Sequence, residues 1–538
     1  DINRLCHEFA LYEVTVLSQS YVKKNLSLAW PLALNALLMQ SMLMIDTLLV
    51  SPLGEVSLAA MGIATTVIAF ILGIQMALAN GTQLVLSRAV GSGIQATLSR
   101  SFLAGMLINF GAAFFFFLAL TFFDDSLISS LTDDTSLHSE IAVYLSFSKY
   151  IVLFTAVTQV IIALFNGLGK TKVPFRGYLI ELPINALVSY IFIHGWSSFE
   201  GLGAQGAAIG SLVAIIIRTV YLYLCIRYEN CVDVSFNAFG SNFSRNVLNH
   251  FKEIFPVAAN VTMLSIGATI YQLLYTQLNI NAYVAITLVM PWIRAGTQFI
   301  TAWAHSSAIT ISQAIGSKQM ADLRKNVDAS IDIAVIISIL SMLFFVALSL
   351  FIGDIYPDLD SATYDALTVI APLYIFLPFV RGYNTVHGHV LRALGKTTAV
   401  FKINFTGQWI ISIPLCALII VGFDGSIFWA FAIQPFEEIV KALPFRHLAR
   451  KSLNEFDEEK AKAEVFRQMA KQEDDIGEML RTAVKLEGSI RNTGIHACGV
   501  VITPDDITNF VPVKTDKGSD MFVTQFDNSV AEDAGLLK

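Results

Sequence analysis

The chain has 538 residues, of which 55% are hydrophobic and 14% charged, with a mean hydropathy of +0.62 and a formal net charge of −7. The surface of a water-soluble protein could not cover so much apolar sequence, so the composition excludes a soluble globular protein and indicates a membrane protein. The five cysteines are scattered, which excludes a disulfide framework and a cysteine metal site.

Twelve mainly apolar segments follow one another along the chain, and we expect each to cross roughly 30 Å of hydrocarbon as a helix. They cover residues 26–50, 57–86, 102–123, 141–165, 174–194, 204–226, 253–277, 284–311, 327–352, 365–391, 399–421 and 425–443. The polar start, residues 1–24, does not have the pattern of a signal peptide. Because the first residue is not Met, we expect a clipped or partial chain.

The first half of the chain repeats in the second half with a shift of about 225 residues. Three pairs of segments recur in the same order: residues 30–35 with 255–260, 87–92 with 312–317, and 168–175 with 394–401. A unit of this length that occurs twice and is almost wholly apolar is typical of a transporter built from two membrane lobes. We therefore expect a first six-helix lobe over residues 21–228, after a polar segment 1–20, and a second lobe over residues 229–450.

Basic residues lie only in the loops that follow the even-numbered spans, for example Arg88, Lys170 and Lys396. The loops after the odd-numbered spans carry no Lys or Arg, and two of them are acidic. Short cytoplasmic loops retain Lys and Arg, so both termini are predicted to be cytoplasmic. Each lobe has an even number of spans, so the two repeats are predicted to run parallel.

Several of these segments also carry a family resemblance. Residues 31–60, the Gly91-Ser92-Gly93 turn, residues 167–174 and residues 203–208 together resemble the multidrug and toxic compound extrusion (MATE) family over residues 21 to about 450. The resemblance implies an all-α membrane protein with two six-helix lobes. It also implies export of cationic amphiphiles in exchange for Na+ or H+, with no catalytic residues, metal site or cofactor.

An ionisable residue inside a span is costly unless it faces a cavity or a partner, and Asp46 is such a residue in the first span. It matches the family's carboxylate in that helix, whose role is to hold a proton or Na+. By the same resemblance Asn185, Ser189 and Ser211 fall on cation-site positions, although they could instead hold helices together by hydrogen bonds. Glu181 is either a pathway residue or an interfacial anchor.

The second lobe departs from the family pattern. Where some relatives have acidic residues this chain has Leu264 and Arg381, and the position of Asp46 is taken by Tyr271. Nearby basic and titratable side chains are candidate pathway residues, namely Arg294, Arg381, His305 and His387, with His389 beside them. We expect no deep carboxylate in this lobe. The cavity could accept anionic or zwitterionic substrates, or the cations could snorkel or pair with carbonyls and helix C-termini.

After Lys451 the sequence becomes charged and water-soluble. Residues 451–477 are predicted to form a linker, with an amphipathic helix over about 464–487, and residues 498–503 and 522–526 are predicted strands. Residues 478–538 form a small α/β fragment that resembles part of the catalytic core of the bacterial DNA polymerase III alpha subunit. That family needs metal-binding carboxylates, and none is recognisable here, so we expect this part to be non-functional and the protein not to be an enzyme.

These patterns predict a secondary active exporter of small amphiphilic compounds, driven by Na+ or H+ and working by alternating access. A flippase of lipid-linked precursors from the same superfamily is the first alternative, and a membrane-tethered polymerase fragment is the second. The expected partners are the lipid bilayer and a small-molecule substrate, without functional nucleic-acid binding. We expect a monomer in the bacterial inner membrane, with both termini cytoplasmic.

Overall fold

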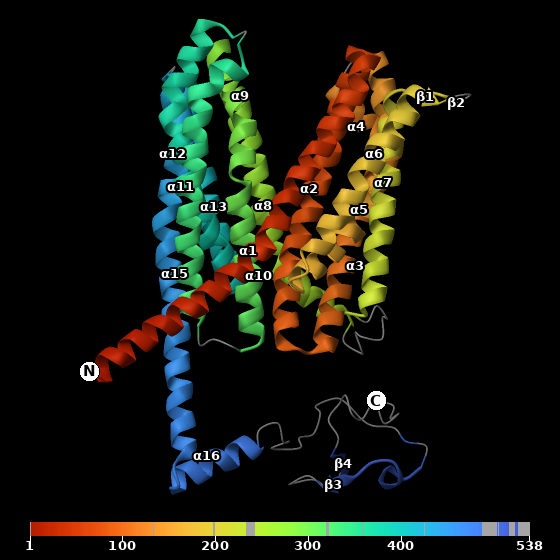
Figure 1. Cartoon of the computed structure of the whole chain (residues 1–538). Helices are drawn as coiled ribbons and strands as arrows, with labels where there is room; N and C mark the ends of the chain where they lie inside the picture. The colour runs from red at the N-terminus through yellow and green to blue at the C-terminus, as the bar shows by residue number, and fades with distance from the viewer. Residues whose placement is uncertain are drawn as a thin grey trace. The chain divides into compact units, whose positions relative to one another are not determined.

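The computed structural model describes residues 2–132, 134–196, 199–232, 243–318, 322–357, 359–423, 425–486, 503, 505–515 and 522–525. The chain divides into two compact units, Asp1–Glu455 and Phe456–Lys538. Within the first unit, Figure 1 shows the helices gathered in two bundles, the first in red to yellow and the second in green to blue.

The first lobe consists of long helices joined by short turns. Its elements are α1 (Ile2–Val50), a 3₁₀ turn (Ser51–Leu53), α2 (Glu55–Ser92), α3 (Gln95–Phe122), α4 (Asp124–Leu131), α5 (Thr135–Gly167), α6 (Lys172–His194), β1 (Gly195–Trp196), β2 (Phe199–Glu200) and α7 (Ala204–Glu229). The two short strands pair antiparallel, with Gly195 opposite Glu200.

The second lobe repeats this plan. Its helices are α8 (Phe243–Tyr275), α9 (Ile280–Gly296), α10 (Gln298–Gly316), α11 (Leu323–Ile355), α12 (Ser361–Ala393), α13 (Thr397–Phe405), α14 (Ile413–Ala417) and α15 (Ile427–Lys471). Two π-helical segments, Thr406–Ser412 and Leu418–Gly422, make α13 and α14 parts of one continuous helical span.

Ten helices among the described residues are long and apolar enough to cross a membrane, and they match ten of the twelve predicted spans. The other two predicted spans are helical but differ in detail. Residues 284–311 form parts of two helices, α9 and α10, with a break between them at Thr297. Of residues 425–443, all from Ile427 onward lie in α15, where Glu437, Glu438 and Lys441 reduce the apolar character.

Local chemistry explains several helix ends. Asp134 caps α5, because its side chain accepts hydrogen bonds from the backbone N–H groups of Ser136 and Leu137. The hydrogen bonds from the hydroxyl of Ser136 and from these two N–H groups hold the pKa of Asp134 below its usual value. Asn279 caps α9 in the same manner, by accepting from the N–H of Ala282. Both caps lie in loops that follow odd-numbered spans. Because they accept hydrogen bonds from the first N–H groups of α5 and α9, these short polar side chains set where the two helices begin.

The repeated Leu-Gly-Lys-Thr segment forms the same turn in both lobes. Gly169 and Gly395 adopt left-handed φ values of 76° and 80°, which a residue with a Cβ rarely adopts. In each turn the next residue donates its N–H to a carbonyl five residues back, at 2.8 Å for Lys170 and 2.9 Å for Lys396. The repeat therefore reflects a shared helix C-terminus with a backbone requirement for glycine.

Each lobe has its own apolar core. Ile141 and Val152 are fully buried in one first-lobe core cluster, and Phe345 and Phe431 are fully buried in the second-lobe cluster. Because Phe431 comes from α15, the first part of this helix completes the second lobe. The first unit extends past residue 450, since Leu453 is buried and Arg324 donates a 2.7 Å hydrogen bond to Asn454.

The second unit contains the end of α15, α16 (Asp475–Leu486), a 3₁₀ turn (Ile507–Asn509) and two strands, β3 (Val513–Thr515) and β4 (Phe522–Thr524). The strands pair antiparallel, with Lys514 opposite Val523. The predicted strand at residues 522–526 is thus confirmed over 522–524, and β3 was not predicted. The predicted amphipathic helix is divided between α15 and α16, and residues 498–502 of the other predicted strand lie outside the described residues.

Candidate ion-coupling site and second-lobe cavity

Asp46 is a buried carboxylate in α1, with 6% of its surface exposed. Ser211 on α7 donates its hydroxyl to Oδ2 of Asp46 over 3.1 Å, and Ser189 on α6 donates to Oδ1 over 3.4 Å. Asn185 on α6 donates its amide to the hydroxyl oxygen of Ser211 at 2.9 Å. The four residues singled out from the sequence therefore lie together, although they come from three helices.

Two glycines of α7 bring α6 close enough to build this cluster. A Cβ on Gly206 would lie 2.4 Å from the carbonyl carbon of Phe192, and one on Gly210 would lie 2.1 Å from Oγ of Ser189. Glycines four residues apart allow two membrane helices to touch along their backbones. This contact places Ser189 and Ser211 on the same side of the α6–α7 pair, where both reach Asp46.

The cluster offers oxygen atoms of several kinds. The side-chain oxygen of Asn185 is buried and has no hydrogen-bond donor among the described residues. Together with the carboxylate of Asp46 and the two hydroxyls, it forms an oxygen-only set, which suits a hard cation. Buried polar atoms normally have partners, so an unpartnered oxygen beside a buried carboxylate fits a site for a proton or Na+.

Glu181 lies two helical turns away from Ser189 on α6 and has a different environment. It is ion-paired with Arg218 of α7, and the two side chains are 2% and 4% exposed. The guanidinium carbon of Arg218 also lies 4.2 Å from the ring centre of Tyr178. The pair thus joins α6 to α7 with its charges neutralised, and a role of Glu181 in the pathway stays a prediction.

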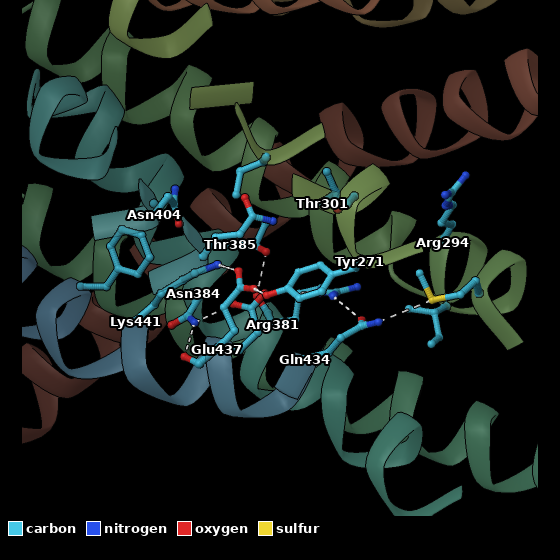
Figure 2. A pocket seen from close by; sticks show the side chains of 18 of the residues that line it. Tyr271, Arg294, Thr301, Arg381, Asn384, Thr385, Asn404, Gln434, Glu437 and Lys441 are labelled. Carbon is cyan, nitrogen blue, oxygen red and sulfur yellow. Dashed lines mark hydrogen bonds and ion pairs between the residues drawn. The ribbon is translucent and has the colours of Figure 1, made fainter. Parts of the chain in front are cut away.

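The second lobe contains a cavity of about 430 Å³ lined by side chains of α8, α9, α10, α12, α13 and α15. Figure 2 shows Glu437 between Tyr271 and Lys441 at this cavity. The hydroxyl of Tyr271 donates to Glu437 at 2.5 Å, and Lys441, one turn further along α15, forms an ion pair with the same carboxylate. Glu437 and Lys441 are 8% and 4% exposed, so this is a buried pair.

A second carboxylate lines the same cavity. Asn384 donates its amide to Glu438 at 2.8 Å, and Nε of Arg381 lies 3.5 Å from the other carboxylate oxygen. Arg381 also donates to the side-chain oxygen of Gln434 at 3.4 Å. Arg381 and Arg294, both predicted pathway residues, therefore do line the cavity, as does Leu264.

The expectation that the second lobe has no deep carboxylate is wrong, because Glu437 and Glu438 lie inside it. They were missed because they stand near the end of the predicted span 425–443, where charged residues usually mark the membrane surface. The helix in fact continues to Lys471. The signal that could have revealed Glu437 is the cation four residues later, since residues four apart share a helix face.

The two predicted histidines have separate surroundings. His305 of α10 lies at the contact between the lobes, where its Nε2 is 2.6 Å from the amide nitrogen of Gln83 in α2. His387 is buried in α12, and its Nδ1 is 2.8 Å from the carbonyl oxygen of Tyr383. Of the residues predicted for the pathway, only Arg294 and Arg381 line the cavity, together with the neighbouring His389.

The MatE family model matches this chain twice, over residues 31–191 and 256–418. The chain belongs to the MatE family. Among solved structures it is similar to the Vibrio cholerae MATE transporter VcmN in its bent form, with a TM-score of 0.73, 18% identity, and coverage of 81% of this chain and 98% of that one. It is also similar to a MOP superfamily transporter from Pyrococcus furiosus, with a TM-score of 0.71, 16% identity, and coverage of 80% of this chain and 96% of that one. The chain is thus a multi-span membrane transporter with the twelve-helix MATE fold.

A second family model, the bacterial DNA polymerase III alpha NTPase domain, matches residues 428–538. DNA polymerase III subunit alpha of Pseudomonas fluorescens is 45% identical over 75 residues, and that of Buchnera aphidicola is 48% identical over 68 residues. Each match spans 6% of the polymerase subunit's length. The matched range begins within α15, whose first part packs into the transporter lobe.

Proposed function

We propose that this MatE-family chain is a secondary active exporter that moves small amphiphilic compounds out of the cell in exchange for Na+ or H+. The observation that carries the proposal is the oxygen cluster around Asp46. A carboxylate buried among hydroxyl and amide groups is stable when it holds a proton or a cation, and it can release either when the site opens to water. Asp46 is thus the residue on which coupling rests, with Asn185, Ser189 and Ser211 as its supporting ligands.

The contacts between the lobes support an alternating-access cycle. Arg88 at the end of α2 is ion-paired with Glu253 of α8, and Oγ1 of Thr82 lies 3.2 Å from Nε2 of His250. These residues lie toward the end of α2 where Arg88 and, at the start of α3, Arg100 stand, the end that the basic-residue rule assigns to the cytoplasm. Opening the transporter to the cytoplasm must break these contacts, and closing it must restore them.

The orientation follows from the same basic loops. We place both termini in the cytoplasm and the transporter in the bacterial inner membrane, working as a monomer. Residues 456–538 take no part in transport in this proposal, because the part of α15 that packs into the second lobe lies before this boundary.

The test is Asp46→Asn in proteoliposomes loaded, in separate arms, with a fluorescent amphiphilic cation and a fluorescent amphiphilic anion. The substitution keeps the shape and the hydrogen bond with Ser211 but removes the charge. We expect gradient-driven efflux to fall to the rate of protein-free vesicles, whether the gradient imposed is of pH or of Na+. The matched control is Asp125→Asn, since the Asp125 side chain is 88% exposed in α4. Efflux that persists in Asp46→Asn at the wild-type rate would refute the assignment.

The same vesicles separate the alternative function. A flippase would move fluorescent lipid analogues between leaflets without an imposed pH or Na+ gradient, whereas an exporter would need that gradient and would leave the lipids in place. Running the pH and the Na+ gradient in separate arms identifies the coupling ion, because only the gradient of the coupling ion drives efflux.

A further inference from the structure

Cations outnumber carboxylates among the side chains that line the second-lobe cavity. The cationic residues are Arg294, Arg381, Arg392 and Lys441, and the carboxylates are Glu437 and Glu438. Both carboxylates already have partners: Glu437 holds Lys441 and Tyr271, and Glu438 holds Arg381 and Asn384. The lining therefore keeps positive charge that its own carboxylates do not neutralise.

Arg392 is the clearest source of this excess charge. Its Nε atom is buried and has no hydrogen-bond acceptor in the part of the chain that the structure describes. No ion pair of Arg392 is found there either, and the same is true of Arg294. The residue as a whole is half-buried. A buried guanidinium N–H without an acceptor is costly, so this position is suited to a group that supplies negatively charged oxygens.

Arg381 and Arg392 stand in a row of four cavity-lining residues on one face of α12. Arg381, Thr385, Gly388 and Arg392 are spaced by four, three and four residues, which is the spacing of one helix face, and all four line the cavity. Thr385 adds a hydroxyl to this row. Gly388 adds no side chain between Thr385 and Arg392, and a Cβ placed there would lie 3.9 Å from the ring of Phe445.

The same cavity also has apolar lining. Leu264, Ala268, Met290 and Phe445 give it an apolar wall. A cavity of about 430 Å³ is of the size that binds small organic molecules. The chemistry that fits is an apolar body with one anionic head.

We propose that the second-lobe cavity binds amphiphilic organic anions, with Arg392 as the principal cation that receives their anionic head group. This inference rests on the proposed export function for its meaning in transport, but binding itself needs no gradient. It names a substrate charge opposite to the cationic amphiphiles expected from the family resemblance. Carboxylates, sulfonates and phosphates share the required chemistry.

The experiment compares ligands that differ only in their head group. Purified full-length protein in neutral phosphatidylcholine nanodiscs is titrated with 2-naphthalenesulfonate, 2-naphthoate, 2-naphthyl phosphate, 2-naphthalenemethanol and 2-naphthyltrimethylammonium, and binding is measured by calorimetry. We expect the anions to bind at least about tenfold more tightly than the neutral and cationic compounds, which is the effect of one charge-assisted hydrogen bond. The order among the three anions identifies the preferred head group.

Two variants test Arg392 itself. Arg392→Gln should lose most of the preference for anions, whereas Arg392→Lys should keep part of it because it keeps the charge. Arg392 lies in the last turn of α12, where a cation also stabilises the helix C-terminus. If that were its only role, Arg392→Gln would weaken the binding of all head groups equally or of none. Arg227→Gln, an exposed arginine of α7 in the first lobe, is the matched control and should bind like wild type.

Equal binding of all head groups, tighter binding of the cation, or an unchanged anion preference in a folded Arg392→Gln variant would overturn the proposal. Asp46→Asn should retain the anion preference, because Asp46 lies in the other lobe. Anion binding in Asp46→Asn with unaltered efflux would therefore refute the coupling role while leaving this inference standing. If wild type binds no anions but its efflux still depends on Asp46, this inference is refuted and the coupling role of Asp46 stands.

Discussion

Replacing Gly91 by alanine should force the two lobes apart where α2 packs against α10. The repeated segments 87–92 of α2 and 312–317 of α10 pack against each other: a Cβ on Gly91 would lie 2.1 Å from the carbonyl oxygen of Gln313, and one on Gly316 would lie 2.0 Å from that of Arg88. Ordinary van der Waals contact begins at 3.4 Å, and both obstacles are backbone atoms that no rotamer change can move away. The helices themselves must separate.

The size of the effect follows from the cost of overpacking. A methyl group inserted into a well-packed contact costs about 1–3 kcal/mol. The proposed alternating-access cycle separates α2 from α10 when this end opens, so that cost should shift the equilibrium toward the open state by about 5- to 150-fold. Gly316→Ala should act alike. Once one methyl has separated the helices the second meets less resistance, so the double variant should cost less than the sum of the two.

The assay measures the distance between spin labels on the two lobes. Exposed positions Ala96, at the start of α3, and Lys325, at the start of α11, are replaced by cysteine in a chain whose five native cysteines are removed. Gly91→Ala should enlarge the population with longer distances. Gly73→Ala, in the same helix but with nothing within 4 Å of the added Cβ, should not. A folded Gly91→Ala variant with the distance distribution of Gly73→Ala would refute the argument.

Three further predictions concern other parts of the chain. Gly210→Ala should displace Ser189 from Asp46 and raise the ion concentration needed for half-maximal efflux several-fold, whereas Gly62→Ala, with open space around its Cβ, should leave that concentration unchanged. Truncation after Glu455 should leave efflux unaltered. Truncation after Lys451 should lower the melting temperature, because it removes the buried Leu453 and also Asn454, the partner of Arg324. Equal melting temperatures of the two truncated proteins would contradict this. Single cysteines that replace Ser136 and Ser361 should react with a membrane-impermeant thiol reagent on intact cells, and those that replace Lys170 and Lys396 should not. Labelling of the cysteine at position 170 with the one at position 396 protected would mean that the lobes are inverted.

The candidate coupling site was predictable because an ionisable residue inside an apolar span is rare. Asp46 is conspicuous for that reason, and the structure brings Asn185, Ser189 and Ser211 to it. Glu437 was not predictable in the same way, because charge near the end of a span usually means that the membrane ends there. Only the structure shows that α15 continues and that Glu437 points toward Tyr271.

The repeat was also visible before the fold, but its two uses were not. The Gly169 and Gly395 turns recur because both need a left-handed residue, which is a local requirement that sequence can suggest. The segments around Gly91 and Gly316 recur because they touch each other across the lobes. That reason is tertiary, and no periodicity within either segment indicates it.

The two lobes have come to use different electrostatics on one backbone plan. The position of Asp46 in the first lobe corresponds to Tyr271 in the second. The carboxylate that faces Tyr271 comes from another helix, since it belongs to Glu437 of α15. In the first lobe the hydrogen-bond partners of Asp46 are neutral, so this carboxylate can exchange a proton or a cation without breaking an ion pair. In the second lobe Glu437 is already paired with Lys441, so exchanging an ion there would leave a buried cation unpaired, at a cost of several kcal/mol. The first lobe is therefore the better place for ion exchange, and the second, with its surplus of cations, is the better place for an anionic ligand.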